Sequence, residues 1–273
     1  MKLRIGFFIL SLILSFQSWA GSELSATGGR ASAMGNTSVA FYDGWSGFNN
    51  QAGLAWCRKF SAGTYFENRY LLKEMSVKAI GVILPVRKGA FGLSFRHFGF
   101  SLYNEIKTGL AFGMHFGNSF SAGIQLDYLR FHLGDDYGTK NLFTFEIGLQ
   151  YRIKEQLCLG VHFFNAVPIR LTEDPIERLP SVITLGIAWQ VSKNFIASAE
   201  VEKDLITKPI FKAGMEYHFI HPLYVRLGFL TNPTMFTFGF GLEFGRFCFD
   251  VASSYHMVLG FSPQGSLIYS FKR

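Results

Sequence analysis

The stretch Met235–Phe244, MFTFGFGLEF, alternates without a break between two kinds of side chain. One face of an extended strand would carry Phe236, Phe238, Phe240, Leu242 and Phe244, and the other Thr237, Gly239, Gly241 and Glu243. Successive side chains of a strand point to opposite faces of its sheet. This stretch therefore predicts a strand with one face in apolar surroundings and the other in polar surroundings.

The same period of two recurs along the chain after residue 58. It is clear in residues 142–153, 183–190, 195–202, 211–219, 223–229 and 247–256, and poor near 60–66 and 75–85. Fourteen such segments follow one another up to the C-terminus. Most have about ten residues, which is the length of a tilted strand that crosses a bilayer.

The connections between these segments alternate in length. Every second one is a two-residue turn: Arg87-Lys88, Gly117-Asn118, Lys154-Glu155, Ser192-Lys193, Ile220-His221 and Gly245-Arg246. The others are mostly longer, up to residues 165–180. Short turns at one end and longer loops at the other are typical of bacterial outer-membrane barrels. We therefore predict an all-β fold, a 14-stranded antiparallel transmembrane β-barrel over residues 59–273.

The composition agrees with a membrane barrel. The 273-residue chain is 49% hydrophobic and 17% aromatic, with 31 Phe. Beyond the N-terminus no apolar run approaches the about 18 residues of a transmembrane helix. A soluble β-sandwich would explain the alternation, but not the aromatic content or the strand length. The net charge of +7 is scattered without a basic cluster, which argues against a nucleic-acid partner.

Residues 1–20 have the pattern of a secretory signal peptide. Lys2 and Arg4 precede an apolar stretch, residues 5–16, and Ser18-Trp19-Ala20 is a small-x-small cleavage site. We expect cleavage after Ala20, export, and integration into the outer membrane of a Gram-negative type of cell. Lipid of that membrane is then the first expected partner.

Residues 21–58 separate the signal peptide from the first strand. They are rich in glycine and small residues, and no alternation lasts in them. The polar faces of the later segments carry charges of both signs: Lys107, Arg152, Lys212, Arg226, Asp127, Glu146, Glu200, Glu202, Glu216, Glu243 and Asp250. An open ion-selective pore would favour rings of one sign. We therefore expect ion pairs in the lumen, and residues 21–58 as an N-terminal plug, or hatch, that fills it.

The sequence gives little support for catalysis or cofactor binding. It contains no nucleophile elbow, no H-E-x-x-H pattern and no phosphate loop. The cysteines Cys57, Cys158 and Cys248 are odd in number and far apart, which fits neither a disulfide framework nor a metal site. We therefore expect a protein that is not an enzyme and holds no metal or cofactor.

A short motif before the first strand carries a family resemblance. The stretch from residue 38 to 55, SVAFYDGWSGFNNQAGLA, resembles the N-terminal signature of FadL-like outer-membrane proteins, most of all the PorV/PorQ branch. The matching positions are Ala40, Asp43, Asn50, Ala52, Gly53 and Leu54. The proline of the family motif is Gln51 here, a departure expected to loosen the turn. The resemblance implies a fourteen-stranded barrel with an N-terminal hatch.

The resemblance implies two functions. FadL-type members carry hydrophobic molecules through the barrel, whereas PorV/PorQ-type members are partners in type IX protein secretion. A ligand pocket is mainly apolar, and the inward faces here are Gly, Ser and charges. Our main hypothesis is therefore an accessory component of type IX secretion or surface attachment. The alternative is a FadL-like transporter of hydrophobic small molecules. Protein partners are expected on the proline-rich loop 165–180, through Ile169, Leu171 and Ile176.

Overall fold

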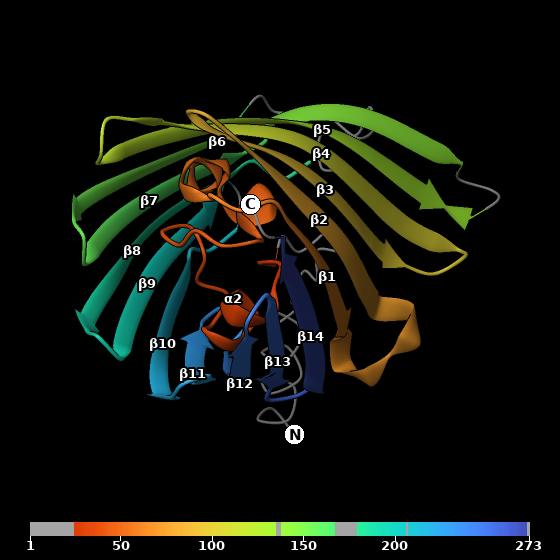
Figure 1. Cartoon of the computed structure of the whole chain (residues 1–273). Coiled ribbons are helices and arrows are strands. Elements are labelled where there is room, and N and C mark those ends of the chain that lie inside the picture. The colour runs from red at the N-terminus through yellow and green to blue at the C-terminus, as the bar shows by residue number, and fades with distance from the viewer. Residues whose placement is uncertain (1–24, 135–137, 167–178, 206, 272–273) are drawn as a thin grey trace, which may run out of the picture.

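The computed structural model describes residues 25–134, 138–166, 179–205 and 207–271. In this part of the chain fourteen antiparallel strands form a closed barrel (Figure 1). The last strand pairs with the first, and Ser270 lies opposite Ser61. The predicted all-β, 14-stranded antiparallel barrel is confirmed. No described helix is long and apolar enough to cross a membrane.

The elements of the chain have the following bounds. The strands are β1 (Ser61–Asn68), β2 (Ser76–Val86), β3 (Gly89–Gly99), β4 (Tyr103–Phe116), β5 (Phe120–Leu133), β6 (Thr139–Lys154), β7 (Leu157–Phe164), β8 (Val182–Ser192), β9 (Phe195–Asp204), β10 (Ile210–Ile220), β11 (Leu223–Leu230), β12 (Met235–Phe244), β13 (Phe247–His256) and β14 (Gly260–Ser270). The helices are α2 (Gly29–Ala33) and α3 (Ser46–Asn49), and the 3-10 turns are η1 (Gln51–Trp56), η2 (Arg69–Leu71) and η3 (Lys73–Met75).

The two ends of the barrel differ as predicted. Turns of two or three residues follow β2, β4, β6, β8, β10 and β12, and we call this the short-turn end. The turns after β6, β8 and β10 begin one residue later than predicted. Each of these strands has a β-bulge just before its turn, at 152–154, 190–192 and 218–220. A bulge adds one residue to one strand of a pair, which moves the turn along the chain. We call the opposite end the loop end.

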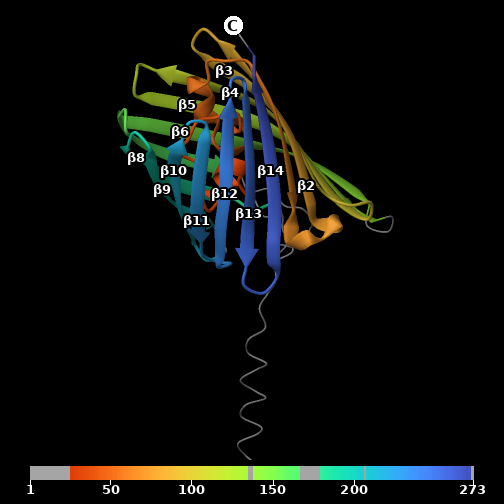
Figure 2. The same cartoon turned by 60° about the horizontal axis from the view of Figure 1, so that its bottom comes forward.

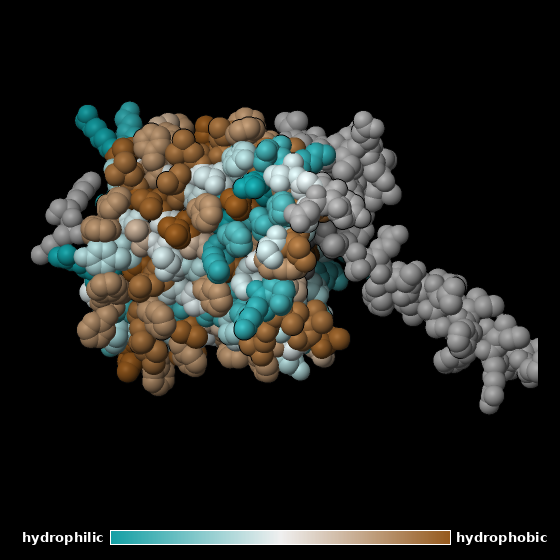
Figure 3. Space-filling view, turned by 90° about the vertical axis from the view of Figure 1, so that its right-hand side faces the viewer, coloured by the Kyte–Doolittle hydropathy of each residue, from teal (hydrophilic) through white to brown (hydrophobic). Residues whose placement is uncertain are grey.

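Large apolar side chains are exposed along the outside of the strands. The face shown in Figure 3 is mostly apolar, with a band of polar side chains across it. Phe238 is 41% exposed on this wall, whereas its neighbour Thr237 points inward and is 2% exposed. An alternation of this kind suits a wall with lipid outside and a polar lumen inside.

The first two strands alternate poorly because part of their lumen face is apolar. Tyr65 of β1 and Val77 and Ala79 of β2 are buried in one cluster with Trp45. Ile83 of β2 is buried in a second cluster with Leu54. These inward side chains pack against the chain inside the barrel, so large apolar residues lie on both faces of β1 and β2.

Residues 25–58, which we call the lumen segment, lie inside the ring of strands (Figures 1 and 2). Helix α2 contacts β11 to β14, α3 contacts β2 to β4, and η1 contacts β3 to β6. The segment thus touches the wall on opposite sides of the lumen. Whether it acts as a hatch is a question of function, and the domain boundaries at residues 21 and 58 stay predictions.

Candidate functional site

The candidate functional site is the surface between the lumen segment and the barrel wall. The part of the wall that faces η1 consists largely of glycine residues. Gly113, Gly123 and Gly148 lie side by side on β4, β5 and β6. A Cβ atom on Gly148 would lie 2.0 Å from Oδ1 of Asn50, and one on Gly123 would lie 2.4 Å from the carbonyl carbon of Gln51. Glycine inside a strand often marks a close approach of another backbone, and here it allows η1 to lie against the wall.

Two further pairs of inward glycines lie farther around the wall of the lumen. Together with Gly113, Gly123 and Gly148 we call them the glycine path. Gly160 of β7 pairs with Gly186 of β8, and both face Val39 of the lumen segment. Gly214 of β10 pairs with Gly228 of β11, below residues 34–35. The inward glycines predicted by the alternation therefore have a steric role that the alternation did not indicate.

Asn50 connects the lumen segment to itself and to the wall. Its Nδ2 donates to the carbonyl oxygen of Val39 at 2.6 Å, and to those of Leu149 and Val161 at 3.3 Å. Its Oδ1 accepts a hydrogen bond from the amide of Ala52 at 3.1 Å and so caps η1. Asn50 is 1% exposed, and it shares the carbonyl oxygen of Val39 with Nε2 of Gln150, which donates to that oxygen at 3.0 Å.

The other residues of the family motif also hold this part of the segment in shape. Ala40 and Ala52 are buried, and Leu54 is buried between β2, β3 and β4. Asp43 accepts from the amide of Trp45 at 2.8 Å. Gly53 lacks the positive φ that favours glycine, and what it needs is space, because a Cβ there would lie 2.7 Å from Oγ of Ser46. The motif residues thus act as structural contacts of the lumen segment.

Gln51, which replaces the proline of the family motif, is a wall contact in this chain. It is fully buried, and its Nε2 donates to Oε2 of Glu146 at 2.5 Å. Glu146 also accepts from Nε2 of His162 at 2.9 Å and pairs with Lys107, which lies 3.5 Å from Asp127. The expectation that the turn at Gln51 is looser than with proline stays a prediction. The predicted lumen positions of Lys107, Asp127 and Glu146 are confirmed.

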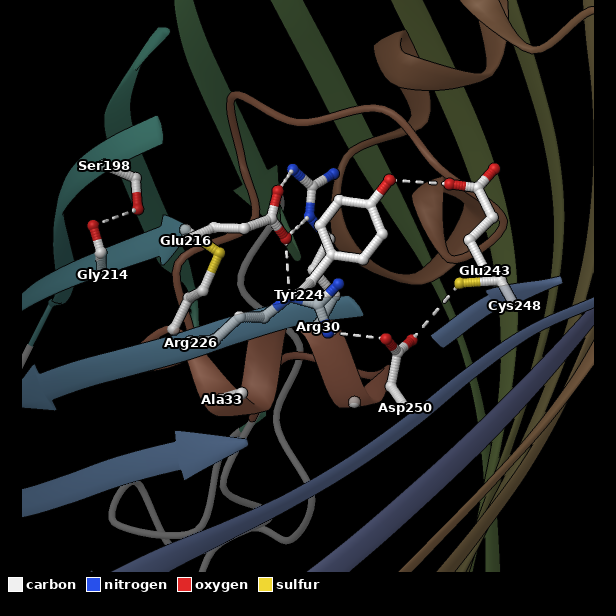
Figure 4. Close-up of polar contacts among 12 residues, drawn as sticks. Arg30, Ala33, Ser198, Gly214, Glu216, Tyr224, Arg226, Glu243, Cys248 and Asp250 are labelled. Carbon is white, nitrogen blue, oxygen red and sulfur yellow. Dashed lines mark hydrogen bonds and ion pairs between the residues drawn. The ribbon is translucent and has the colours of Figure 1, made fainter. Parts of the chain in front are cut away.

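On the opposite side of the lumen, α2 is held by charges. Arg30 donates to both carboxylate oxygens of Glu216, at 2.9 and 2.8 Å. Glu216 also accepts from Nε of Arg226 at 2.6 Å, and Arg226 Nη1 donates to Asp250 at 2.6 Å (Figure 4). These four side chains form a row of alternating sign. The alternation of the strands predicted that Glu216, Arg226 and Asp250 point into the lumen. Arg30 was missed because residues 21–58 have no periodic pattern that shows which way a side chain points.

Hydroxyl and carboxylate groups of the wall bind the backbone between the two halves of the segment. Thr237 donates to the carbonyl oxygen of Ala33 at 2.8 Å and accepts from the amide of Gly35 at 2.8 Å. Glu200 accepts from the amide of Val39 at 2.6 Å and also from that of residue 38. Thr37 and Ser198 lie with their Oγ atoms 2.7 Å apart. These wall side chains therefore provide hydrogen-bond partners for backbone groups of the lumen segment that would otherwise be buried without them.

A small cavity lies between the segment and the wall. It has a volume of about 60 Å³ and is lined by Lys107, Lys212, Glu146, Glu200, His162, Phe48 and Phe164 among others. This volume has room for a few water molecules at most.

An apolar cluster in the lumen lies next to this cavity. Leu129, Phe131, Phe164, Leu179 and Val182 are buried together, and Leu142 packs against them. Phe164 and Val182 also line the cavity. The expectation that the inward faces carry only Gly, Ser and charges is therefore wrong near the loop end of β5 to β8. Single inward apolar residues could be seen in the sequence, but only the register of four strands gathers them in one place.

The remaining sequence predictions concern the partner loop, the cysteines and metal binding. Ile169, Leu171 and Ile176 lie outside the described residues. Cys57, Cys158 and Cys248 are not joined in disulfides, and burial raises the pKa of the Cys57 thiol to about 12. Within the described residues no group of three His, Cys, Asp or Glu side chains could hold a metal ion.

The fold is similar to that of solved outer-membrane channels. The toluene transporter TbuX of Ralstonia pickettii is 13% identical, with a TM-score of 0.68 over 91% of this chain and 98% of that chain. The toluene transporter TodX of P. putida is 13% identical, with a TM-score of 0.65 over 92% and 100%. A Pseudomonas aeruginosa FadL homologue is 12% identical, with a TM-score of 0.66 over 92% and 98%. No protein-family model and no curated protein matches the sequence.

The fold of this chain is therefore FadL-like. The proteins that it resembles are channels and transporters, and none of them is named as an enzyme. The placement in the PorV/PorQ branch stays a prediction. At identities of 12–13% a shared fold does not fix a shared cargo.

Proposed function

We propose that this chain is an outer-membrane transporter of a small hydrophobic molecule, and that the lumen segment closes it in the conformation described. This reverses the order of the two functions that the sequence suggested. The observation that carries the proposal is the apolar cluster of Leu129, Phe131, Phe164, Leu179, Val182 and Leu142, inside a FadL-like barrel. A lumen built only as support for a protein partner has no need of an apolar face next to a cavity.

The cluster is placed where a cargo would first meet the interior. It lies on the loop-end half of β5 to β8, and Phe164 and Val182 continue into the cavity. Ligand sites combine an apolar lining with a few polar groups that fix orientation. Lys107 stands over the ring of Phe164, 4.8 Å from its centre, and supplies such a group. A small aromatic or aliphatic molecule has the chemistry that this surface favours.

Passage beyond the cavity requires a movement of the lumen segment. Val39, Phe48 and Asn49 of the segment line the cavity. Turn η1 packs directly on the glycine path of the wall. The segment is held by hydrogen bonds, ion pairs and close packing, and no described disulfide ties it to the wall. Its contacts can therefore break and re-form without any covalent step.

A disulfide lock tests the proposal. Thr37 and Ser198 have their Oγ atoms 2.7 Å apart, so a Thr37→Cys/Ser198→Cys variant places two sulfur atoms within bonding range. The three native cysteines are first replaced by alanine. The purified protein is reconstituted in vesicles, and uptake of a radiolabelled monoaromatic hydrocarbon is measured with and without reductant. We expect uptake above that of empty vesicles in the reduced state and a return to that background after oxidation.

The single variants Thr37→Cys and Ser198→Cys are the matched controls, and neither should respond to oxidation. Equal uptake by the locked and reduced forms would show that the segment need not move. Uptake that never exceeds that of empty vesicles would overturn the transport proposal itself.

The accessory role in type IX secretion remains a second candidate, because one observation favours it. The cavity beside the segment is small and lined in part by charges, which suits a closed barrel that acts through its surface. This candidate is tested by purification from the native membrane, comparing wild type with a variant in which Ile169, Leu171 and Ile176 are replaced by Ser. Loss of a co-purifying secreted protein, with barrel assembly intact, would support it over transport.

A further inference from the structure

Two neighbouring connections at the loop end carry exposed apolar side chains. These are Leu71 and Leu72 between β1 and β2, and Met257, Val258 and Leu259 between β13 and β14. We call this set the apolar rim. Val258 is 85% exposed, and the other four lie between 49% and 66%. Exposed apolar residues in such a group mark a surface that contacts another apolar phase or molecule.

The two connections lie side by side. The amide of Tyr70 donates to Oγ of Ser262 on β14 at 2.9 Å. The ring of Tyr70 meets the ring of His256 edge-on, with 5.9 Å between their centres. The apolar rim is therefore one patch that spans β13, β14, β1 and β2.

The patch continues the lipid-facing wall. Phe236, Tyr255 and Phe261 lie opposite one another on β12, β13 and β14, and all three are exposed on the outside of the barrel. The only residues between Tyr255 and Phe261 are His256, the three apolar rim residues and a glycine. On β13 and β14, no formally charged Lys, Arg, Asp or Glu side chain therefore separates the apolar wall from the tip. On β2 the exposed Lys78, opposite His97 of β3, lies between the outward Ile80 and the connection that carries Leu71 and Leu72.

The wall ends differently on β5 and β6. There Tyr128 pairs with Phe143, and the next outward pairs toward the loop end are Arg130 with Asn141 and His132 with Thr139. These polar pairs indicate that β5 and β6 continue past the apolar zone into water. β5 and β6 have 14 and 16 residues, whereas β13 and β14 have 10 and 11.

Part of the backbone of the apolar rim is hydrogen-bonded within the protein. The amides of Val258 and Leu259 both donate to Nδ1 of His256, at 3.1 Å each. The amide of Leu72 donates to the carbonyl oxygen of Arg69 at 3.0 Å. In a membrane interior every backbone polar group needs a partner within the protein. The amides of Leu72, Val258 and Leu259 meet that requirement.

We propose that the apolar rim is embedded in the lipid of the membrane, so that this side of the barrel ends within the bilayer while β5 and β6 rise out of it. Continuity with the lipid-facing wall identifies lipid, and no second protein, as the occupant. Lys73 and Glu74 are exposed in the same connection as Leu72, and Lys78 is exposed on β2. The stems of the two lysines can lie along apolar surface with their charges in the polar layer. The inference depends on the transmembrane barrel and is independent of the proposed cargo.

Fluorescence quenching tests the proposal. Single cysteines are placed at Val258 and Leu71, and for comparison at Thr139 and Asn141, in a chain whose native cysteines are alanine. Each is labelled with an environment-sensitive fluorophore, and the protein is reconstituted in phosphatidylcholine vesicles with or without brominated acyl chains. We expect bromolipid to quench the probes at Val258 and Leu71 several-fold more than those at Thr139 and Asn141. Aqueous iodide should give the reverse order.

Heat-modifiable migration on gels confirms assembly of each variant, and Leu259→Cys serves as a second rim probe. If the rim probes are quenched by iodide as strongly as Asn141→Cys, the rim lies in water and the proposal is wrong. Protection of the rim probes from both quenchers would also overturn it, because a protein surface would then cover the patch.

Discussion

The two halves of the lumen segment are held against the wall mainly by different kinds of interaction. Helix α2 is held by a row of charges, from Arg30 through Glu216 and Arg226 to Asp250. Turn η1 is held mainly by close packing on glycine, by the side-chain amide of Asn50 and by the hydrogen bond from Gln51 to Glu146. The difference indicates two strengths of attachment. The free energy of an ion pair depends on its surroundings, whereas a backbone on a glycine path tolerates no added atom.

This contrast suggests how a barrel can be closed and still open. A charged contact can be exchanged for water or for another charge when the segment moves. A close-packed contact has no such substitute and returns to one position. We infer that η1 fixes where the segment sits and that α2 sets how readily it leaves.

The largest effect is expected from removal of Glu216. Glu216→Ala leaves Arg30 and Arg226 without their shared carboxylate, and breaking a buried pair costs about 3–5 kcal/mol. The measurement is urea unfolding of the protein in vesicles, together with protease cleavage of the lumen segment. Glu243→Ala is the matched control, because Glu243 is exposed and binds only Tyr224, at 2.8 Å. Equal loss of stability in the two variants would show that the row of charges does not hold α2.

The next effect is expected on the glycine path. In Gly148→Ala the new Cβ would meet Oδ1 of Asn50 at 2.0 Å, and such overpacking costs about 1–3 kcal/mol. The barrel should still assemble, while hydrogen exchange of residues 50–54 rises. Gly265→Ala is the control, since its nearest atom would be 3.9 Å away. Unchanged exchange in Gly148→Ala would mean that η1 does not lie on the glycine path in the membrane.

A smaller effect is expected from Asn50→Ala. The change removes the cap of η1 and the donor to the carbonyl oxygen of Val39. Loss of an N-cap costs about 1 kcal/mol, and no further carbonyl penalty is expected at Val39, because its oxygen keeps the hydrogen bond from Nε2 of Gln150. The midpoint of urea unfolding should fall with an unchanged slope. Asn49→Ala tests the neighbouring amide, which binds only Thr27 of the segment itself, and should cost less.

The same comparison shows which contacts the sequence could predict. Lys107, Glu146, Glu216 and Arg226 were placed in the lumen because each alternates with an apolar residue in a strand, and the period of two fixes its direction. Their partners on the lumen segment could not be found in this way. Arg30 lies in a stretch without a period, and its contact with Glu216 spans 186 residues of sequence.

The apolar cluster was missed for a related reason. Leu129, Phe164 and Val182 interrupt the polar face of their strands one at a time, and a single exception has little weight in a sequence. The pairing of Phe164 with Val182 and of Leu129 with Leu142 makes them neighbours. The sequence predicts the register of the strands only approximately. The register revealed the apolar cluster, and the cluster reversed the ranking of the two functions.

The smallest expected effect concerns the joint between the two halves of the segment. Burial raises the pKa of Asp43 above its ordinary value of 3.8, so the seated segment retains a proton that a released segment loses. Seating is then favoured below pH 3.8 and weakens as the pH rises through the raised pKa. Asp43→Asn keeps an oxygen for the amide of Trp45 and cannot titrate. Hydrogen exchange of residues 43–47 should rise with pH in wild type, after correction for intrinsic exchange, and remain level in Asp43→Asn. A parallel rise in both proteins would assign the pH dependence to another group and leave Asp43 with a purely structural role.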